Sequence, residues 1–478
     1  LLHILIDAGL IDREYVEAHT TGFEALRDSL RDYTPERVSE ITGLSVDLLY
    51  RTASLYGGAR AAFIGWTMGV NHSSKGTETV NAINNLALVT GNIGRAGAAP
   101  FSITGQCNAM GTRETGFSSS LPGYRAFESA ADREELAAIW RVPPDRIPTA
   151  RGLAYPDIVE AAVDRRIRAL WVIGTNPIVS FPNLGVLRQA LETLDFLVVQ
   201  DGFHPTPTSE LADLVLPAAI WGEKEGSYTN SERRVSRVSR AVDPPGEARS
   251  DFRIFLDVAE ALGCRDDLFP GWTQPSDAFD EWKRVSAGRI CDYSGMTYDL
   301  IERHGGIQWP FTSSHADEDA GAPRRLYADG VFRTADGKAR LIPTAWEPFP
   351  EQPTAAYPLV LNTGRTVEHW HTRTKTGEVP ILERLSPGAW VEVNPRDARA
   401  LELRPPHRVD VVSQRGRIRS LELRVTETVA PGQVFVPFHW AEWNANQVTQ
   451  SAFDPISREP NYKQCAVRLE RTEHDRYR

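Results

Sequence analysis

The chain has 478 residues, 41% of them hydrophobic, and its formal net charge at pH 7 is -10. Such a length predicts about three domains, and the mean hydropathy of -0.34 is typical of a soluble protein. No stretch approaches the roughly 18 apolar residues of a membrane span, and the acidic balance disfavours nonspecific binding to nucleic acid or anionic lipid.

Helical patterns dominate the chain up to about residue 105, with helices expected over 13–19 and 22–33. The apolar run 61–65 predicts a strand, and Met68 and His72 follow just past its end. Because the chain begins inside an amphipathic helix pattern, we expect it to be the carboxy-terminal portion of a longer protein, with any targeting signal upstream.

A long irregular segment over residues 100–116 is built from glycine, small and polar residues and carries one cation, Arg113. Segments of this kind inside a compact domain are usually functional or disordered. Phe101, Ile103 and Met110 recur through it, which favours order because disordered segments are poor in such residues. We therefore expect a substrate loop with Arg113 buried in it.

An α/β unit follows, with strands expected over 167–173, 196–199 and 211–217 and a helix over 184–194. Strand, helix and strand at this spacing predict a right-handed crossover in a parallel sheet. Ligands bind such sheets beyond the carboxyl ends of the strands. The candidate ligand contacts at these ends are Asn176, Asp201 and Lys224.

Residues 266–350 are rich in Pro, Gly and Asp and are expected to form irregular connecting structure. Beyond residue 355, short β-rich runs separated by turn residues predict a small β-barrel. These runs are 358–362, 390–394, 408–413, 421–426 and 433–437. The expected fold class is therefore α/β, with Rossmann-like parallel-sheet domains followed by a carboxy-terminal barrel. The predicted domains are 1–105 (α/β, incomplete), 106–265 (Rossmann-like), 266–350 (connecting region) and 351–478 (barrel).

The four cysteines are widely spaced and include no Cys-x-x-Cys pair that would hold zinc or an iron-sulfur cluster. We therefore expect reduced thiols, which favour a cytoplasmic location. A periplasmic location stays open because an export signal would lie upstream. No Gly-x-Gly-x-x-Gly or Walker motif is present, which leaves little support for NAD or ATP binding.

Several motifs together resemble one family. Residues 104–116 contain Thr-Gly-Gln-x-Asn-Ala-Met-Gly-x-Arg-Glu-x-Gly, residues 363–372 are Thr-Gly-Arg-Thr-Val-Glu-His-Trp-His-Thr, and late motifs contain Phe438, Asn446 and Lys463. The combination is similar to the molybdopterin oxidoreductases and most like the catalytic subunit of assimilatory nitrate reductases. The resemblance implies a six-stranded barrel of the double-psi type and a molybdenum cofactor with two molybdopterin guanine dinucleotides.

The segment 363–372 follows the first expected barrel strand. Its glycine lets the backbone approach a ligand, and its hydroxyls, imidazoles and amides suit a flat polar heterocycle. Taken alone, it is typical of a capped turn with one cation and two surface histidines, with Phe438 in a core and Lys463 on the surface. The resemblance instead implies that a larger set closes over the pterins: Thr363, Gly364, Arg365, Thr366, Val367, Glu368, His369, Trp370, His371, Thr372, Phe438, Asn446 and Lys463.

In the α/β half, the resemblance implies that the guanosine diphosphate arms contact Asn176, Gln200, Asp201, Lys224 and Asp251. A carboxylate can accept hydrogen bonds from a guanine edge's donors or from ribose hydroxyls, and a lysine can neutralise pyrophosphate. The structural alternative has Asp201 capping a helix and Lys224 paired with Glu223 or Glu225.

The residues that correspond to the surroundings of the metal in relatives are Met68, His72, Thr104, Gln106 and Arg113. The resemblance implies that Met68 and His72 contact the cofactor, although His72 departs from the family, in which Gln is frequent. The expected catalytic group is Met68, Thr104, Gln106 and Arg113. Formate dehydrogenases are expected to carry Arg where this chain has Thr104, whereas nitrate reductases use the position of Arg113. A guanidinium presents a planar fork of donors to a planar oxyanion, so Arg113 is assigned to nitrate, with an ion pair to Glu114 as the structural alternative.

The resemblance implies an enzyme that reduces nitrate to nitrite by oxygen-atom transfer, with an electron donor such as ferredoxin, flavodoxin or an NADH-linked reductase subunit. The family's four-iron four-sulfur cluster and metal ligand are expected upstream, and the portion in this chain is expected to be inactive alone. One alternative is a formate dehydrogenase-like member, against which Thr104 argues. Another is a non-catalytic electron-relay scaffold, against which the retained segment 363–372 argues.

Overall fold

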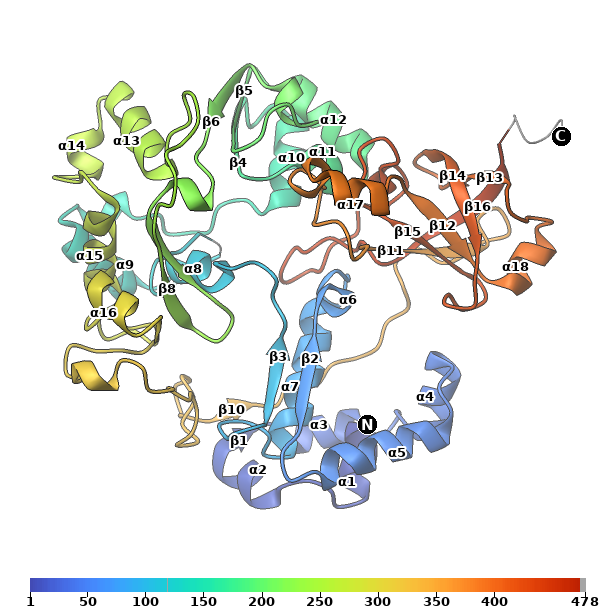
Figure 1. Ribbon diagram of the computed structural model, residues 1–478. Coiled ribbons are helices and arrows are strands. Elements are labelled where there is room, and N and C mark those ends of the chain that lie inside the picture. The colour runs from blue at the N-terminus through green and yellow to red at the C-terminus, as the bar shows by residue number, and fades with distance from the viewer. Residues whose placement is uncertain (118, 473–478) are drawn as a thin grey trace. The chain divides into compact units, whose positions relative to one another are not determined.

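The computed structural model of the protein describes residues 1–117 and 119–472 and forms two compact units. Unit 1 consists of Leu1–Gly105, Pro323–Phe349 and Phe453–Glu459, and unit 2 consists of the remaining described residues. Figure 1 shows the helices and strands of both units, coloured along the chain. Within the described ranges, no helix is long and apolar enough to cross a membrane.

Unit 1 is mainly helical. Its helices are α1 (Leu2–Asp7), α2 (Arg13–His19), α3 (Phe23–Ser29), α4 (Pro35–Thr42), α5 (Val46–Gly58), α6 (Met68–Asn71) and α7 (Gly76–Val89), and its strands are β1 (Thr20–Thr21), β2 (Phe63–Trp66), β3 (Ala99–Ser102) and β10 (Ala339–Arg340). Several helix starts are fixed locally, since Asp12, Thr34 and Ser45 each accept a backbone N–H from the first turn of α2, α4 and α5. β2 pairs in parallel with β3, and an apolar core joins α1, α2, α3 and α7.

The start of α7 is held by a carboxylate from a distant part of the chain. Asp454 accepts hydrogen bonds from the backbone N–H and from the hydroxyl of Thr77, both at 2.9 Å. The first turn of a helix leaves its backbone N–H groups unpaired, and Asp454 satisfies one of them. This contact ties residues 453–459 into unit 1.

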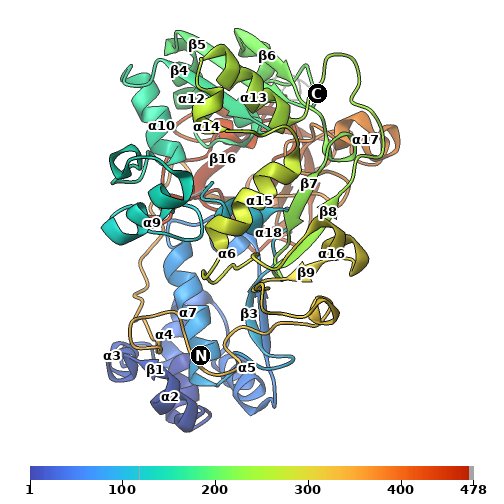
Figure 2. The same ribbon diagram turned by 90° about the vertical axis from the view of Figure 1, so that its left-hand side faces the viewer.

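A parallel sheet in the order β4-β5-β6 forms the first layer of unit 2, with strands Ala169–Ile173, Phe196–Asp201 and Leu214–Pro217. Helices α10 (Tyr155–Val163) and α12 (Leu184–Thr193) pack on this sheet through a buried apolar cluster (Figure 2). Successive strand residues point to opposite faces, and Trp171 of β4 contacts Phe255 of α13 (Asp251–Ala261) on the other face. The strand, helix and strand predicted from the sequence are present, with helices on both faces.

A second, antiparallel sheet has the order β7-β8-β9, with strands Gly226–Thr229, Arg234–Val238 and Ile307–Gln308. Further helices of this region are α8 (Ala109–Glu114), α9 (Ala130–Trp140), α14 (Arg265–Leu268), α15 (Pro275–Ser286) and α16 (Tyr298–Arg303). Helices α15 and α16 fall where only irregular structure was expected. α15 is 12 residues long, begins at Pro275 and buries Phe279 and Val285 on one face, so its amphipathic pattern was present in the sequence. The Pro, Gly and Asp content of the surrounding region had favoured irregular structure instead.

The carboxy-terminal part of unit 2 is a closed barrel in the order β11-β15-β12-β14-β13-β16. Its strands are β11 (Leu359–Gly364), β12 (Trp390–Val393), β13 (Arg408–Val412), β14 (Arg417–Val425), β15 (Gln433–Pro437) and β16 (Cys465–Arg471), and the connections carry α17 (Pro380–Leu385) and α18 (Pro395–Ala400). Leu361, Val391, Val409 and Val434 are fully buried inside it. β16, which was not among the expected β-rich runs, pairs antiparallel with β11 and β13 and closes the barrel. The predicted fold class, parallel-sheet α/β structure followed by a six-stranded barrel, is confirmed.

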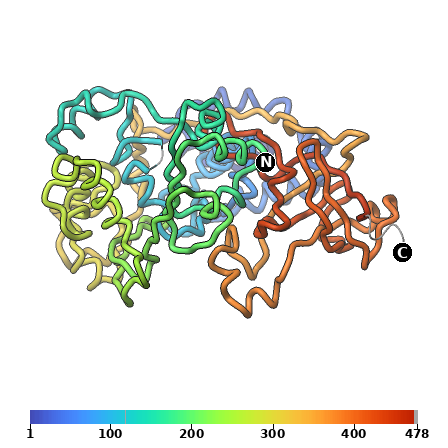
Figure 3. Tube along the Cα trace, turned by 90° about the horizontal axis from the view of Figure 1, so that it is seen from above, coloured from blue at the N-terminus to red at the C-terminus, as the bar shows by residue number. Residues whose placement is uncertain are grey.

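Hydrogen bonds to α11 (Pro177–Ser180) join the barrel to the parallel sheet of unit 2. Asn444 and Asn446 each donate a side-chain N–H to a carbonyl of this helix, at Ile178 (2.7 Å) and Val179 (2.8 Å). Figure 3 shows the green trace of the sheet's helices beside the red trace of the barrel. The carboxyl edge of the parallel sheet and the barrel, which are far apart in sequence, therefore belong to the same compact unit.

Candidate functional site

A polar cluster lies where the parallel strands of unit 2 end. Gln200, near the end of β5, is fully buried and donates its side-chain N–H to a carboxylate oxygen of Asp251 at 2.7 Å. The ammonium of Lys224 pairs with the other carboxylate oxygen of Asp251. Lys224 is therefore committed to Asp251 and not to Glu223 or Glu225, its neighbours in sequence.

The side-chain carbonyl oxygen of Gln200 is buried and has no hydrogen-bond partner in the described chain. An unsatisfied buried acceptor costs about 1–3 kcal/mol, and a ligand that donates a hydrogen bond here would remove that cost. The ammonium of Lys224 beside it suits a negatively charged group. A nucleotide carries both donors and negative charge, so these residues fit the dinucleotide arms that the resemblance implies.

Asn176 and Asp201 lie at the same edge of the sheet. Asn176 is buried, and its side-chain carbonyl accepts a hydrogen bond from the hydroxyl of Thr208 at 2.7 Å. Asp201 accepts the backbone N–H of Phe203 at 3.0 Å, so its carboxylate supports a turn and not the helix that the structural alternative predicted. Burial raises the pKa of Asp201, because its charged form is poorly solvated at this position.

The segment 363–372 leaves the barrel at the end of β11. Thr363 is buried and donates its hydroxyl to the carbonyl of Tyr462 at 2.9 Å. A β-carbon added to Gly364 would lie 2.5 Å from the Phe435 ring, so a side chain here would force that ring to move. The point at which the chain leaves the strand is therefore tightly held.

The three late-motif residues take different positions. Lys463 donates to the carbonyl of Thr363, and burial, together with the charge of Arg365, lowers the pKa of Lys463 to about 8. Phe438 is half-buried and packs against the barrel core. Asn446, as described above, joins the barrel to the sheet through its side-chain N–H. Lys463 thus lies beside segment 363–372, whereas the Asn446 amide donates its hydrogen bond to helix α11.

The turn after β11 is held by a histidine that was not selected from the sequence. His439 is fully buried; its Nε2 accepts the backbone N–H of Thr366 at 2.8 Å, and its Nδ1 donates to the carbonyl of His371 at 2.6 Å. These partners lie 73 and 68 positions earlier in the chain. Because only the parallel pairing of β11 with β15 brings them to His439, no local pattern could reveal this role.

The two histidines inside the segment have different roles. His369 is buried, and its Nε2 donates to the carbonyl of Ser386 at 2.7 Å. The Nε2 of His371 lies 3.2 Å from the Arg365 guanidinium and 3.1 Å from the side-chain nitrogen of Gln106. Burial and the Arg365 charge lower the pKa of His371 to about 4, so its ring is neutral at pH 7 and its Nε2 can accept a hydrogen bond from the Gln106 side chain. The predicted substrate loop and the segment therefore meet at Gln106 and His371.

The remaining residues of the segment include an exposed apolar and cationic surface. Val367 is fully exposed, Trp370 is 41% exposed, and the Arg365 guanidinium lies 5.0 Å from the centre of the Trp370 ring. Glu368 and Thr372 are half-buried. An aromatic ring and a guanidinium together offer flat faces and donors, which fits a polar heterocycle.

Arg113 lies on the short helix α8 and is exposed, so the expectation that it is buried is wrong. In the described ranges, its guanidinium forms no ion pair or hydrogen bond. The next residue, Glu114, is fully buried and accepts hydrogen bonds from the Tyr293 hydroxyl and the Trp309 indole, both at 2.6 Å. Because Glu114 points into the interior, the ion pair between Arg113 and Glu114 is not formed.

The predicted metal surroundings are divided between the units: unit 1 contains Met68, His72 and Thr104, and unit 2 contains Gln106 and Arg113. Met68 begins α6 just past β2, as the sequence predicts. His72 follows that helix, and its Nε2 lies 3.1 Å from the carboxylate of Glu459. Among the described residues, no group of three or more His, Cys, Asp or Glu side chains is placed to hold a metal ion, and all four cysteines are free thiols.

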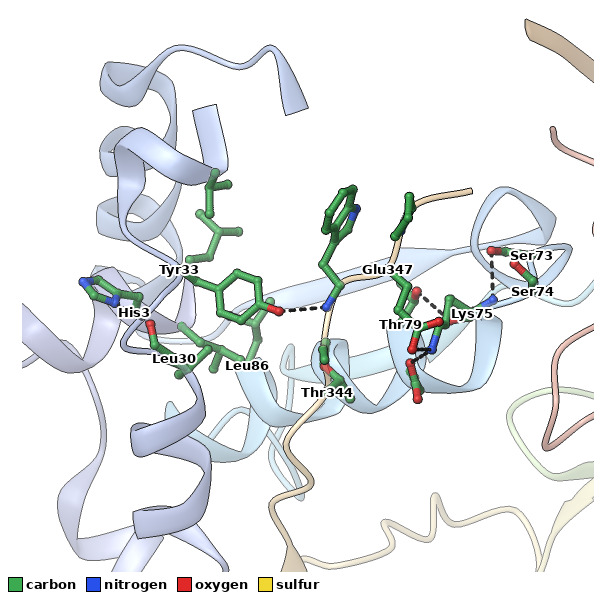
Figure 4. Close-up of a pocket in the computed structure, with 18 of the residues that line it drawn as sticks. His3, Leu30, Tyr33, Ser73, Ser74, Lys75, Thr79, Leu86, Thr344 and Glu347 are labelled. Carbon is green, nitrogen blue, oxygen red and sulfur yellow. Dashed lines mark hydrogen bonds and ion pairs between the residues drawn. The ribbon is translucent and has the colours of Figure 1, made fainter. Parts of the chain in front are cut away.

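A cavity of about 490 Å³ lies in unit 1, lined by α7 and residues 344–349 among others (Figure 4). The Tyr33 hydroxyl accepts the backbone N–H of Trp346 at 2.8 Å at its wall. Lys75 in the lining pairs with Glu78 and with Glu347, each at 2.9 Å. None of the predicted site residues lines this cavity, so it is distinct from the candidate site.

The sheet edge with its unsatisfied acceptor and the tightly held segment after the barrel strand are both in unit 2, an α/β unit with a closed barrel, and their chemistry fits a nucleotide-like ligand. Residues 2–261 match the family model described as molybdopterin oxidoreductase, and residues 359–466 match the model described as the molydopterin dinucleotide binding domain. The first match covers more than half of the chain, and the chain belongs to the molybdopterin oxidoreductase family. This confirms the resemblance seen in the sequence, and both models support a molybdopterin dinucleotide cofactor.

Curated relatives include enzymes of two named activities. The chain is 37% identical over 475 residues to a nitrate reductase from Synechocystis, covering 98% of this chain and 66% of the relative. It is 38% identical over 472 residues to a formate dehydrogenase subunit alpha from Methanocaldococcus jannaschii, covering 98% and 67%. It is 34% identical over 474 residues to the catalytic subunit of an assimilatory nitrate reductase from Bacillus subtilis, covering 98% and 65%. The chain thus spans about two thirds of the length of these relatives.

The solved structure of acetylene hydratase from Pelobacter acetylenicus superposes with a TM-score of 0.75 and 19% sequence identity, covering 98% of this chain and 69% of that one. This likeness establishes the fold alone.

Proposed function

We propose that this chain supplies the substrate-binding and much of the cofactor-binding machinery of a molybdenum-dependent nitrate reductase. The observation that carries the proposal is Arg113, an exposed guanidinium that no described residue pairs. A permanently charged, planar fork of donors matches a planar oxyanion such as nitrate. In a chain with a net charge of -10, such a local cation is what an anionic substrate requires.

The helix that carries Arg113 is rigidly seated, which supports a binding role. Glu114 is anchored by Tyr293 and Trp309, and Asn108 at the start of α8 accepts the backbone N–H of Thr229 at 2.9 Å. These contacts fix the backbone from which the Arg113 side chain extends. Its guanidinium is not neutralised by any described neighbour and stays available to an anion.

The cofactor assignments follow the same logic. Gln200, Lys224 and Asp251 would hold nucleotide arms at the sheet edge, with Asn176 and Asp201 beside them, and segment 363–372 would hold the pterin. When bound, the molybdenum cofactor supplies the two-electron centre for oxygen-atom transfer. The chain's own residues bind and orient: Arg113 holds the anion, and Gln106 links the loop to segment 363–372 through His371. Reduction also requires an electron donor, for which ferredoxin, flavodoxin or an NADH-linked reductase subunit are the candidates.

The proposal is tested by steady-state kinetics of the full-length enzyme with Arg113→Ala and Arg113→Lys. Because charge-assisted hydrogen bonds contribute about 1.5–3 kcal/mol, we expect Arg113→Ala to raise the KM for nitrate by about 10- to 100-fold. Arg113→Lys keeps the charge without the planar fork and is expected to fall between the wild type and Arg113→Ala. An unchanged KM in Arg113→Ala at normal molybdenum content would defeat the assignment.

Formate oxidation is the second candidate, since a formate dehydrogenase subunit is 38% identical to this chain. Thr104, where the resemblance expects arginine in formate dehydrogenases, argues against it. Parallel assays of the full-length wild type with nitrate and with formate distinguish the two. We expect turnover of nitrate and none of formate, and the reverse result would replace the proposed substrate.

A further inference from the structure

His439 makes two hydrogen bonds with opposite polarity to one short turn. Its Nε2 faces the backbone N–H of Thr366 at 2.8 Å, and its Nδ1 faces the carbonyl of His371 at 2.6 Å. A backbone N–H can only donate and a carbonyl can only accept. The ring must therefore be neutral, with its proton on Nδ1, and both nitrogens are used.

The two bonds fall near the ends of the exposed part of the segment. Between Thr366 and His371 lie Val367 and Trp370, whose side chains are exposed. His371 has a backbone φ of 45°, a left-handed conformation that a residue with a β-carbon adopts only when its surroundings hold it. The bond from His439 to the His371 carbonyl supplies such a hold.

The position of His439 is itself fixed by the barrel. It is fully buried and is the second residue after β15, whose parallel pairing with β11 runs as far as Pro437 and Gly364. Its ring lies 5.8 Å from that of His369 and 5.6 Å from that of Trp440. A rigid strand therefore presents a rigid ring to a turn that has no regular structure of its own.

We propose that His439 is a positioning residue that clamps residues 366–371 in the shape that receives the pterin part of the dinucleotide cofactor. This inference rests on the proposed cofactor role of segment 363–372 and adds a residue that does not itself face the ligand. His371, the clamped end of the turn, contacts Gln106 at 3.1 Å, so the clamp also sets the point at which the predicted substrate loop meets the segment.

Two polar substitutions of His439 each keep one of its two hydrogen bonds and remove the other. In His439→Gln, the side-chain oxygen can reach the place of Nε2 and accept from Thr366. In His439→Asn, the side-chain nitrogen can reach the place of Nδ1 and donate to His371. His439→Ala removes both bonds. Val411→Ala is the matched control, because Val411 is fully buried in the barrel on β13, which pairs with β14 and β16.

The test uses the full-length protein and two readouts, amide hydrogen exchange of peptides covering 363–372 and the amount of molybdopterin dinucleotide retained per protein. We expect exchange at Thr366 to accelerate by at least about tenfold in the Ala and Asn variants and to stay slow in the Gln variant. We expect His439→Ala to retain several-fold less dinucleotide than Val411→Ala, with the Gln and Asn variants between them.

Unchanged exchange at Thr366 in both the Ala and Asn variants would overturn the clamp. Faster exchange with undiminished dinucleotide would overturn its role in cofactor binding. If His439→Ala does not fold, the opposite behaviour expected of the Gln and Asn variants at Thr366 still decides the matter. Nitrate turnover is a separate measurement, so a wild type inactive on nitrate would count against the proposed substrate and not against His439.

Discussion

The side-chain nitrogen of Gln106 lies 3.1 Å from Nε2 of His371, although 265 positions separate the two residues. One belongs to the loop predicted to face substrate and the other to the segment predicted to face the pterin. Because burial and Arg365 lower the pKa of His371 to about 4, its ring is neutral and accepts this hydrogen bond. The hydrogen bond between an amide and a neutral ring therefore holds the predicted substrate loop against segment 363–372 and adds no charge to the candidate site.

Glu114 is expected to anchor helix α8. Glu114→Ala would leave the buried Trp309 indole without its acceptor and the Tyr293 hydroxyl with only the Thr229 hydroxyl as a partner, so we expect a loss of about 3 kcal/mol in the free energy of unfolding. Denaturant unfolding of the full-length protein measures this loss. The exposed Glu134→Ala serves as the control and is expected to change stability by less than about 0.5 kcal/mol. Equal stability of the two variants would contradict the anchoring role.

Asp251 is expected to organise the polar edge of the sheet. Asp251→Ala removes the acceptor of both the Gln200 amide and the Lys224 ammonium, and we expect it to cost about 2 kcal/mol and to lower the retained dinucleotide. The comparison is Glu260→Ala on the same helix, whose ion pair is exposed and contributes little. Dinucleotide retained at wild-type levels in Asp251→Ala would remove these residues from the cofactor assignment.

Gly364 is expected to tolerate no side chain. In Gly364→Ala the new β-carbon would lie 2.5 Å from the Phe435 ring, and such overpacking costs about 1–3 kcal/mol. Gly226→Ala, with no atom within 4 Å of the added carbon, is the control and is expected to leave thermal stability nearly unchanged. Adding Phe435→Leu to Gly364→Ala removes the ring and should restore part of the lost stability. If Gly364→Ala loses no stability and Phe435→Leu restores none, the close approach is refuted.

Acid is expected to destabilise the fold partly through His439. Burial lowers the pKa of His439 from 6.5 to about 4; the hydrogen bond to the His371 carbonyl opposes this shift and the nearby Arg365 and Arg373 charges add to it. The unfolded chain therefore takes up a proton below about pH 6.5 that the folded chain refuses until about pH 4, so stability falls as pH decreases across this window. The full effect amounts to about 3 kcal/mol.

The check is denaturant unfolding from pH 4 to 7, comparing wild type with His439→Gln. Other groups titrate in the same range. Burial raises the pKa of Glu459 to about 7, which acts in the opposite sense, and burial lowers the pKa of His371 to about 4, which acts in the same sense, so only the difference between the two proteins is informative. We expect the wild type to lose more stability toward pH 4 than the variant. Parallel curves would show that His439 titrates normally.

Local patterns in the sequence predicted much of the framework. The run of strand, helix and strand in β4, α12 and β5 follows from apolar runs and turn residues that act over a few positions. The placement of Met68 just past β2, and of Asn176 and Asp201 at strand ends, follows in the same way. The number of barrel strands, six, was predicted from the family resemblance, because the local sequence of β16 was not recognised as a strand.

The contacts that shape the site were decided only by tertiary structure. Arg113 was expected to be buried and is exposed, because the neighbouring Glu114 takes the inward position and is satisfied by Tyr293 and Trp309. Lys224 pairs with Asp251, and His439 holds a turn 68 to 73 positions away. Propensity, capping and turn chemistry operate within a few residues and can be read from the chain, whereas strand register and helix packing choose which distant side chains meet. The kinds of groups at the site were therefore visible in the sequence, and their pairing, burial and charge state were set by the fold.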